Sequence, residues 1–201
     1  MVSEIGIYIE GIGDSEPLAR QLQPPPNRKI KLPKKETQAG LAPGFRTFFQ
    51  SLDRLAYNHG IKIQLIICGG RKQAYNNFHR AIQDHPDAFN VLLVDSEGLL
   101  SDINQPWKYL QDRPEYQWDS QGIDDSHCQL MVQAMEAWFI ADLDTLRQFY
   151  GEKFKDNKII RGLEQYQTVD RVSVYNLEKR LTQATKDTPR GKYSKTKHAP
   201  K

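Results

Sequence analysis

Residues 91–98 read VLLVDSEG, an apolar run that stops at two carboxylates and a glycine. A similar stretch lies near the N-terminus, where residues 7–14 read IYIEGIGD. The buried strands of a parallel sheet are nearly continuous apolar runs, and ligands bind at the carboxyl ends of such strands. The two stretches therefore predict an α/β fold with acidic side chains at one edge of its sheet.

The rest of the chain alternates between short apolar runs and helical patterns. This alternation indicates a mostly parallel sheet of about four strands flanked by helices. Asp142 and Gly151 are the start and stop signals of a helix. Strands are predicted at 4–10, 61–68, 89–94 and 127–133, and helices at about 14–23, 43–59, 72–83, 99–111, 134–151 and 176–185.

The helix predicted at 43–59 has the clearest amphipathic pattern. Pro43 is a favoured first residue of a helix, and Gly60 is a favoured stop. A polar connection over 24–41 precedes it. The apolar residues that recur with helical spacing, and so predict one buried face, are Phe45, Phe48, Phe49, Leu52, Leu55 and Ala56.

Charge is unevenly distributed along the 201 residues. The net charge is +3, but residues 179–201 hold eight Lys or Arg against one acid and so carry +7, which leaves −4 on the remainder. A second basic run includes Arg28, Lys29 and Lys31. Two basic segments suit a polyanionic partner such as DNA or RNA, although two solvated, partly disordered segments would show the same charge. We expect one domain at 1–178 with a long basic loop at 24–42, followed by a basic C-terminal segment at 179–201.

Other features of composition exclude membrane and secreted classes. No stretch approaches the roughly 20 apolar residues that span a bilayer, and no basic segment with an apolar run opens the chain. Cys68 and Cys128 lie in apolar runs without a CxxC spacing, which indicates reduced thiols. We therefore expect a cytoplasmic protein with no membrane partner.

The acids at the two predicted strand ends are candidate ligands of a divalent cation. Glu10 and Asp14 are about one helical turn apart, and Asp95 and Glu97 alternate as on an extended strand. Clustered carboxylates repel one another, and Mg²⁺ prefers such oxygen ligands. Each acid also has a simpler reading. Asp14 is equally consistent with a helix N-cap, and residues 95–98 with an ordinary turn after a strand.

Glu136 is a fifth acid, set in the apolar sequence AMEAWFI at 134–140. A carboxylate there must be exposed, paired, protonated or bound to metal, because burial without a partner costs several kcal/mol. We expect Glu136 to complete the acidic site. The alternative is a solvent-facing turn of an amphipathic helix.

The glutamate of EGIGD at 10–14 and the acids of DSEG at 95–98 resemble the catalytic pattern of Toprim domains in topoisomerases, primases and overcoming-lysogenization-defect nucleases. More closely, the chain resembles a bacterial Toprim-like family of unassigned function, whose members are often encoded beside ABC-type ATPases in defence loci. One departure is Glu97, where the Toprim pattern usually has Asp. The resembling segments are YIEG at 8–11, GGR at 69–71, LVDSEG at 93–98, MVQAMEAWFIAD at 131–142 and GKYSKTKHA at 191–199.

The resemblance implies a Toprim-like fold and an Mg²⁺- or Mn²⁺-dependent phosphodiesterase acting on DNA or RNA, together with an ABC-type ATPase, in a prokaryotic defence system. Glu10, Asp95, Glu97 and Lys195 would be catalytic. The metal ligands would be Glu10, Asp14, Asp95, Glu97 and Glu136. The nucleic acid would contact Arg71, Lys192, Lys195, Arg28, Lys29 and Lys31. The alternatives are a non-catalytic adaptor that regulates the ATPase and a phosphotransferase acting on a small nucleotide.

Overall fold

The computed structural model describes residues 2–11, 36–100, 102–161, 163, 169–194 and 198, with the side chains of 36–41 and 170 left aside. By its contacts the chain divides into two compact units, one within Met1–Val94 and one within Asp95–His198. In the part of the chain that the structure describes, no helix is long and apolar enough to cross a bilayer. The division into 1–178 and 179–201 stays a prediction.

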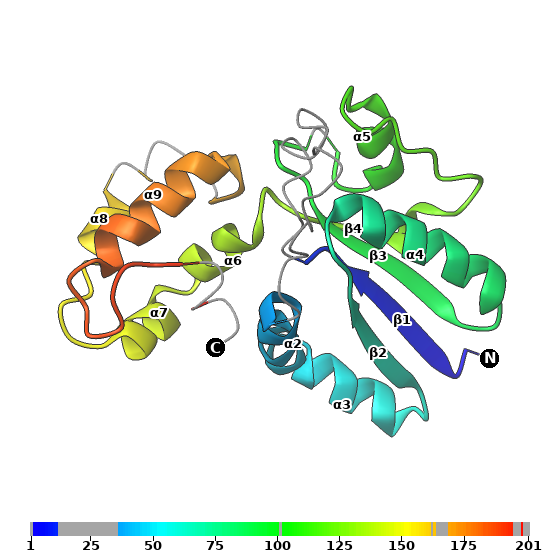
Figure 1. Cartoon of the computed structure of the whole chain (residues 1–201), viewed down its shortest axis with the longest axis horizontal. Helices are drawn as coiled ribbons and strands as arrows, with labels where there is room; N and C mark the ends of the chain where they lie inside the picture. The colour runs from blue at the N-terminus through cyan, green and yellow to red at the C-terminus, as the bar shows by residue number, and fades with distance from the viewer. Residues whose placement is uncertain are drawn as a thin grey trace, which may run out of the picture. The chain divides into compact units, whose positions relative to one another are not determined.

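The centre of the fold is a four-stranded parallel sheet with the strand order β2-β1-β3-β4. Its strands are β1 (Glu4–Ile9), β2 (Lys62–Ile67), β3 (Phe89–Asp95) and β4 (Cys128–Met131). In the register, Ile9 pairs with Ile67 of β2 on one side and with Leu93 of β3 on the other. The predicted α/β class and the parallel sheet of about four strands are confirmed (Figure 1).

Three helices cover the sheet within the first unit. The helix α4 (Arg71–Asp84) packs against β1, while α2 (Glu36–Phe48) and α3 (Gln50–Asn58) pack against β2 (Figure 1). Phe78 of α4, Ile9 of β1 and Leu92 of β3 are each fully buried in the core around the sheet. Asn90 is also buried, and its side-chain amide donates to the carbonyl oxygens of Ala81, His85 and Ala88, so its burial is compensated.

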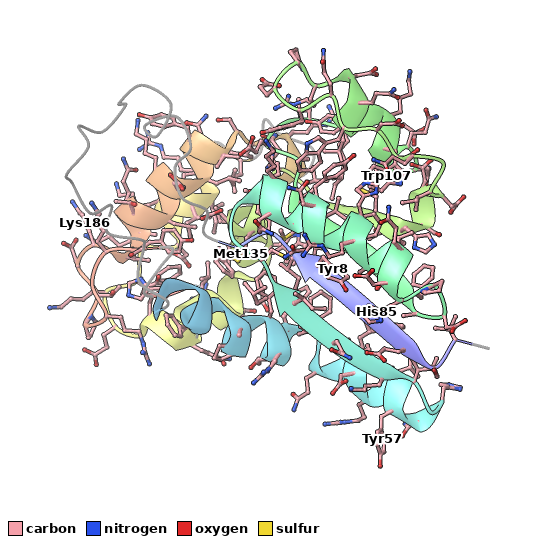
Figure 2. The ribbon with its side chains drawn as sticks, turned by 45° about the vertical axis from the view of Figure 1, so that its right-hand side comes forward. Tyr8, Tyr57, His85, Trp107, Met135 and Lys186 are labelled. Carbon is pink, nitrogen blue, oxygen red and sulfur yellow. The ribbon has the colours of Figure 1, made fainter. Side chains whose placement is uncertain are left out.

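The helix predicted from Pro43 differs from the observed one in two ways. The helix starts earlier, at Glu36, so Pro43 lies inside α2, and the chain leaves helical geometry at Phe49 before α3 begins. The predicted apolar face is therefore not continuous. Phe45 and Ala56 are buried, whereas Phe48, Leu52 and Leu55 are 58%, 44% and 56% exposed. Tyr57, which projects from the end of α3 in Figure 2, is 81% exposed.

The second unit is mostly helical. Its elements besides β4 are α5 (Pro106–Asp112), α6 (Met135–Ala141), α7 (Leu143–Tyr150), α8 (Asn157–Ile160) and α9 (Val174–Thr185), with two short 3-10 turns at Asp125–His127 and Val169–Arg171. The helix predicted at 99–111 is shorter than expected because it starts only at Pro106, whose ring favours the first turn. The predicted cap at Asp142 and the stop at Gly151, which has φ +67°, are confirmed.

A separate apolar core holds these helices together. Helix α6 packs against α9 and α7, and α8 packs against α9. Ile159, Val172, Leu177 and Leu181 are completely buried in it. Burial of each such side chain contributes about 1.5–3 kcal/mol, which allows helices as short as α8 to persist.

Candidate functional site

Glu10 follows β1 directly and forms an ion pair with Arg71, whose Nε lies 3.1 Å from Oε2 of Glu10. The two side chains are only 16% and 8% exposed, so solvent screens the pair weakly. Arg71 is the first residue of α4, and the extended Gly70 before it caps that helix. Arg71, predicted to clamp a phosphate, therefore contacts a predicted catalytic acid of the same unit.

Two backbone hydrogen bonds fix the strand end that carries Glu10. The amide of Gly11 donates to the carbonyl of Gly69 at 3.0 Å, and the amide of Cys68 donates to the carbonyl of Ile9 at 2.9 Å. A Cβ atom on residue 11 would lie 2.3 Å from the carbonyl oxygen of Cys68. Only glycine therefore permits this close approach of the two strand ends.

Asp95 and Glu97 lie at the end of β3, where the backbone turns. Asp95 is the last residue of the strand, Ser96 is 1% exposed, and Glu97 has φ +55°. The expectation of an extended backbone through Glu97 is wrong. The turn forms because Ser96 Oγ donates to the carbonyl of Gly98 at 2.7 Å, while the amide of Glu97 donates to the carbonyl of Gln133 at 2.8 Å.

Two tyrosines hold this turn, and neither was singled out as a partner of the acids in the sequence. Tyr116 donates its hydroxyl to Oε2 of Glu97 at 2.6 Å, and Tyr109 donates to the carbonyl of Ser96 at 2.9 Å. A Cβ atom on Gly98 would lie 2.9 Å from the hydroxyl oxygen of Tyr109, so glycine leaves room for this hydroxyl. The sequence signal that could have pointed to these tyrosines is the group of aromatic residues interspersed with charged residues at 107–118.

The strands that carry these acids are neighbours in the sheet. Ile9 of β1 pairs with Leu93 of β3, and the amide of Glu10 donates to the carbonyl of Leu93 at 2.9 Å. Because the strands run parallel, both reach their carboxyl ends at the same edge of the sheet. The two acidic strand ends therefore belong to adjacent parallel strands of the sheet.

Glu136 lies at the start of α6 and is 0% exposed. Its Oε1 accepts a hydrogen bond from the hydroxyl of Tyr193 at 2.8 Å. The solvent-facing alternative is therefore wrong, and the carboxyl is buried with a hydrogen-bond partner. Burial, with the nearby Glu136 carboxyl as a second cause, raises the pKa of Tyr193 far above its usual value, so the tyrosine stays a donor.

Tyr193 is fastened by the segment on either side of it. Its amide donates to Oγ1 of Thr185 at 2.7 Å, and Thr188 donates to the carbonyl of Thr185 at 2.8 Å. The ring of His198, which the sequence placed in the basic segment, lies 5.5 Å from the ring of Tyr150. The segment around Tyr193 thus packs on the helical core, while Lys192 is exposed.

The predicted metal site is not assembled by the described residues alone, which contain no group of three or more His, Cys, Asp or Glu able to hold a metal ion. The donor chemistry nevertheless suits a hard cation, because carboxylates supply oxygen ligands and each has about four lone-pair sites. Asp14 lies outside the described residues, as do Lys195, Arg28, Lys29 and Lys31. Their predicted roles, and those of Glu10, Asp95, Glu97, Glu136, Arg71 and Lys192, stay predictions.

The fold and these strand ends define an α/β protein with a parallel four-stranded sheet and acids at the carboxyl ends of two adjacent strands. The chain belongs to the family described as domain of unknown function DUF4276, whose model matches residues 9–201. This match confirms the expected membership of a family of unassigned function. No curated protein and no solved structure matches the chain.

Proposed function

We propose that this protein is a divalent-cation-dependent phosphodiesterase acting on DNA or RNA. The observation that carries the proposal is the parallel pairing of β1 with β3, since Glu10 follows the first strand and Asp95 ends the second. Carboxyl ends of parallel strands are where α/β proteins place their reacting groups. We also propose the Toprim relationship, a role in prokaryotic defence, a cytoplasmic location and an ABC-type ATPase as partner, all on the resemblance of the sequence motifs.

In this proposal Asp95, Glu97 and Asp14 hold Mg²⁺ or Mn²⁺, together with Glu10. A bound cation would polarise the phosphoryl oxygen and lower the pKa of an attacking water. Tyr116 orients the carboxylate of Glu97 through its 2.6 Å hydrogen bond. Through its ion pair, Arg71 holds the carboxylate of Glu10 in one orientation, from which Glu10 would accept a proton or ligate the cation. Lys195 and Lys192 would stabilise the developing charge on the phosphate.

A second candidate function is a non-catalytic adaptor that binds nucleic acid and regulates an ATPase. The ion pair between Glu10 and Arg71 favours it, because it neutralises a predicted catalytic carboxylate without a metal. Tyr116 similarly occupies one oxygen of Glu97. The two functions differ in one observable, which is cleavage that depends on the strand-end acids.

The test is a cleavage assay with plasmid, single-stranded DNA and tRNA in Mg²⁺ or Mn²⁺, with and without the ATPase encoded nearby. We expect Asp95→Asn and Glu10→Gln to reduce cleavage by about 10²-fold or more, as for loss of a group that acts on the transition state. Calorimetric titration of Mn²⁺ should show binding by the wild type and weaker binding by Asp95→Asn.

Glu152→Gln is the matched control, because Glu152 is an exposed acid in the turn between α7 and α8. It should leave both cleavage and Mn²⁺ binding unchanged. Cleavage that both strand-end variants retain would overturn the catalytic assignment. Binding of nucleic acid with no cleavage under any condition would establish the adaptor instead.

A further inference from the structure

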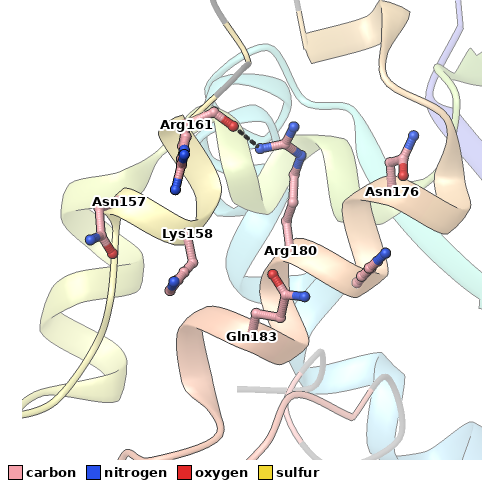
Figure 3. Close-up of a pocket in the computed structure, with 7 residues that line it drawn as sticks. Asn157, Lys158, Arg161, Asn176, Arg180 and Gln183 are labelled. Carbon is pink, nitrogen blue, oxygen red and sulfur yellow. Dashed lines mark hydrogen bonds between the residues drawn. The ribbon is translucent and has the colours of Figure 1, made fainter.

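A basic pocket of ≈ 270 Å³ lies between α8 and α9 in the second unit (Figure 3). None of the described residues that line it is acidic, and four of the seven are cations. Its lining residues are Asn157, Lys158 and Arg161 from α8 and its end, and Asn176, Lys179, Arg180 and Gln183 from α9.

The α9 residues of the pocket form one polar face of that helix. Residues 176, 179, 180 and 183 follow the spacing i, i+3, i+4, i+7, which places them on the same side. The opposite side carries Leu177, Leu181 and Ala184, which are fully buried in the helical core. The core therefore fixes the rotation of α9 and turns its cations and amides into the pocket.

Arg180 lines the basic pocket and links α9 to the end of α8. Its Nη1 donates to the carbonyl oxygens of Ile159 and Arg161, each at 2.7 Å (Figure 3 draws the bond to Arg161). These bonds satisfy carbonyls at the end of α8 and hold the guanidinium in one orientation. A guanidinium has five N–H donors, and the donors on Nε and Nη2 take no part in these two hydrogen bonds.

Asp156, the acid next to the pocket residue Asn157 in the sequence, is already engaged. Asp156 lines an adjoining cavity of ≈ 370 Å³ together with Asn157, Lys158, Ile160 and Arg161. Its Oδ2 lies 2.8 Å from Nη2 of Arg147, and its Oδ1 accepts from the amide of Asn157 at 2.7 Å. The carboxylate of Asp156 is therefore engaged by Arg147 and by a backbone amide, and Asp156 does not line the basic pocket.

We propose that the pocket between α8 and α9 binds a phosphate group. Arg offers a planar fork that matches phosphate oxygens, and Lys adds point charges. The side-chain amides of Asn157, Asn176 and Gln183 add neutral donors for the same oxygens or for an attached base. The attraction of a bound phosphate would also offset the mutual repulsion of the four cations.

The phosphate belongs either to a nucleic-acid strand or to a small phosphate such as pyrophosphate or a mononucleotide. The first source rests on the proposed function, whereas the pocket itself does not. The test measures binding by the full chain in EDTA, where no cleavage is needed. The pocket proposal can therefore be tested even if the protein is not a nuclease. The readouts are anisotropy of a fluorescein-labelled single-stranded oligonucleotide and calorimetric binding of pyrophosphate and AMP.

The pocket variant is Lys158→Gln combined with Lys179→Gln, which leaves Arg180 and its bonds to α8 in place. The matched control is Lys108→Gln with Lys153→Gln, two exposed lysines of the same unit that lie outside the basic segment 179–201 and do not line the pocket. Both double variants remove two positive charges. Near 100 mM salt we expect the pocket variant to weaken binding about tenfold and the control less than about twofold.

The two phosphate sources give different patterns. Loss of oligonucleotide binding in the pocket variant assigns the pocket to a nucleic-acid strand. Loss of pyrophosphate or AMP binding, with oligonucleotide binding unchanged, assigns it to a small phosphate. If the pocket variant and the control bind every probe alike, the proposal is overturned. Matching circular dichroism spectra and melting temperatures establish that both doubles are folded.

Discussion

At the scale of single residues, buried polar groups carry the most information. Glu136 is 0% exposed and accepts from Tyr193, whose own side chain is among the buried ones. Burying a carboxyl costs several kcal/mol unless a hydrogen bond compensates. The pair therefore fastens the segment after α9 to the start of α6, and the hydrogen bond from the tyrosine hydroxyl offsets part of the cost of this burial.

Replacing Tyr193 by Phe should destabilise the protein by about 1–3 kcal/mol, because the buried Oε1 of Glu136 loses its donor. Urea denaturation followed by circular dichroism measures this loss. Tyr175→Phe is the control. Tyr175 is 71% exposed and contacts Lys179 through its ring, which Phe retains, so the change should stay within about 0.5 kcal/mol. Equal stabilities of the two variants would contradict the anchoring role.

At the scale of elements, the cap at Asp142 decides where one helix ends and the next begins. Asp142 accepts from the amide of Thr145 at 3.0 Å and from its hydroxyl at 2.7 Å, and so separates α6 from α7. These hydrogen bonds lower the pKa of Asp142 below its usual value, the backbone bond being the larger cause. A lowered pKa in the folded state means that the ionised cap stabilises the fold.

Asp142→Ala should therefore destabilise the protein near neutral pH. The difference from wild type should shrink as the pH falls below about 3.9 and through the lowered pKa of the folded state, because the cap is then protonated in both states. Urea denaturation of the wild type and the variant, near neutral pH and below about pH 3.9, measures this difference in stability. Asp142→Asn should behave like wild type near neutral pH, since Asn caps helices about as well as Asp. A loss independent of pH would show that the charge has no part in capping.

At the scale of the whole molecule, both thiols lie at strands of the sheet: Cys68 directly follows β2, and Cys128 is the first residue of β4. Cys68 and Cys128 are free and buried. Burial raises the pKa of both thiols, which suppresses the reactive thiolate. Reactivity of the thiols therefore reports on opening of the fold.

In the native protein, both thiols should react with Ellman's reagent far more slowly than a free thiol does near pH 8. In concentrated guanidinium chloride, 2 equivalents should react at once, as the sequence has 2 cysteines. The reagent's absorbance gives both rates. Rapid titration of either thiol in the native state would show that its unit opens readily.

Net charge is also a property of the whole chain, which carries +3 with an excess of cations in 179–201. Binding to single-stranded nucleic acid should weaken as salt rises, with a slope in log K against log salt of about −0.7 for each phosphate neutralised. Anisotropy titrations across a salt series measure the slope. An affinity that does not change with salt would show that charge contributes little to the encounter.

How far the sequence predicts this protein can be judged from particular elements. The apolar runs before Glu10 and Asp95 predict β1 and β3, and Asp142 and Gly151 predict the limits of α7, because burial and capping act over a few neighbouring residues. The start of α2 at Glu36 and the break at Phe49 were missed. Local signals such as Pro43 bias a helix boundary, but tertiary context routinely overrides them, and α2 packs against β2.

The sequence by itself determined the α/β class and the acids that follow β1 and β3, since both depend on hydrophobic pattern along the chain. Only the tertiary structure decided their partners. Arg71 pairs with Glu10, Tyr116 with Glu97 and Tyr193 with Glu136 across 61, 19 and 57 residues. The basic pocket likewise needs α8 and α9 packed together. The physical reason is that such contacts depend on how distant segments pack, which local sequence does not encode.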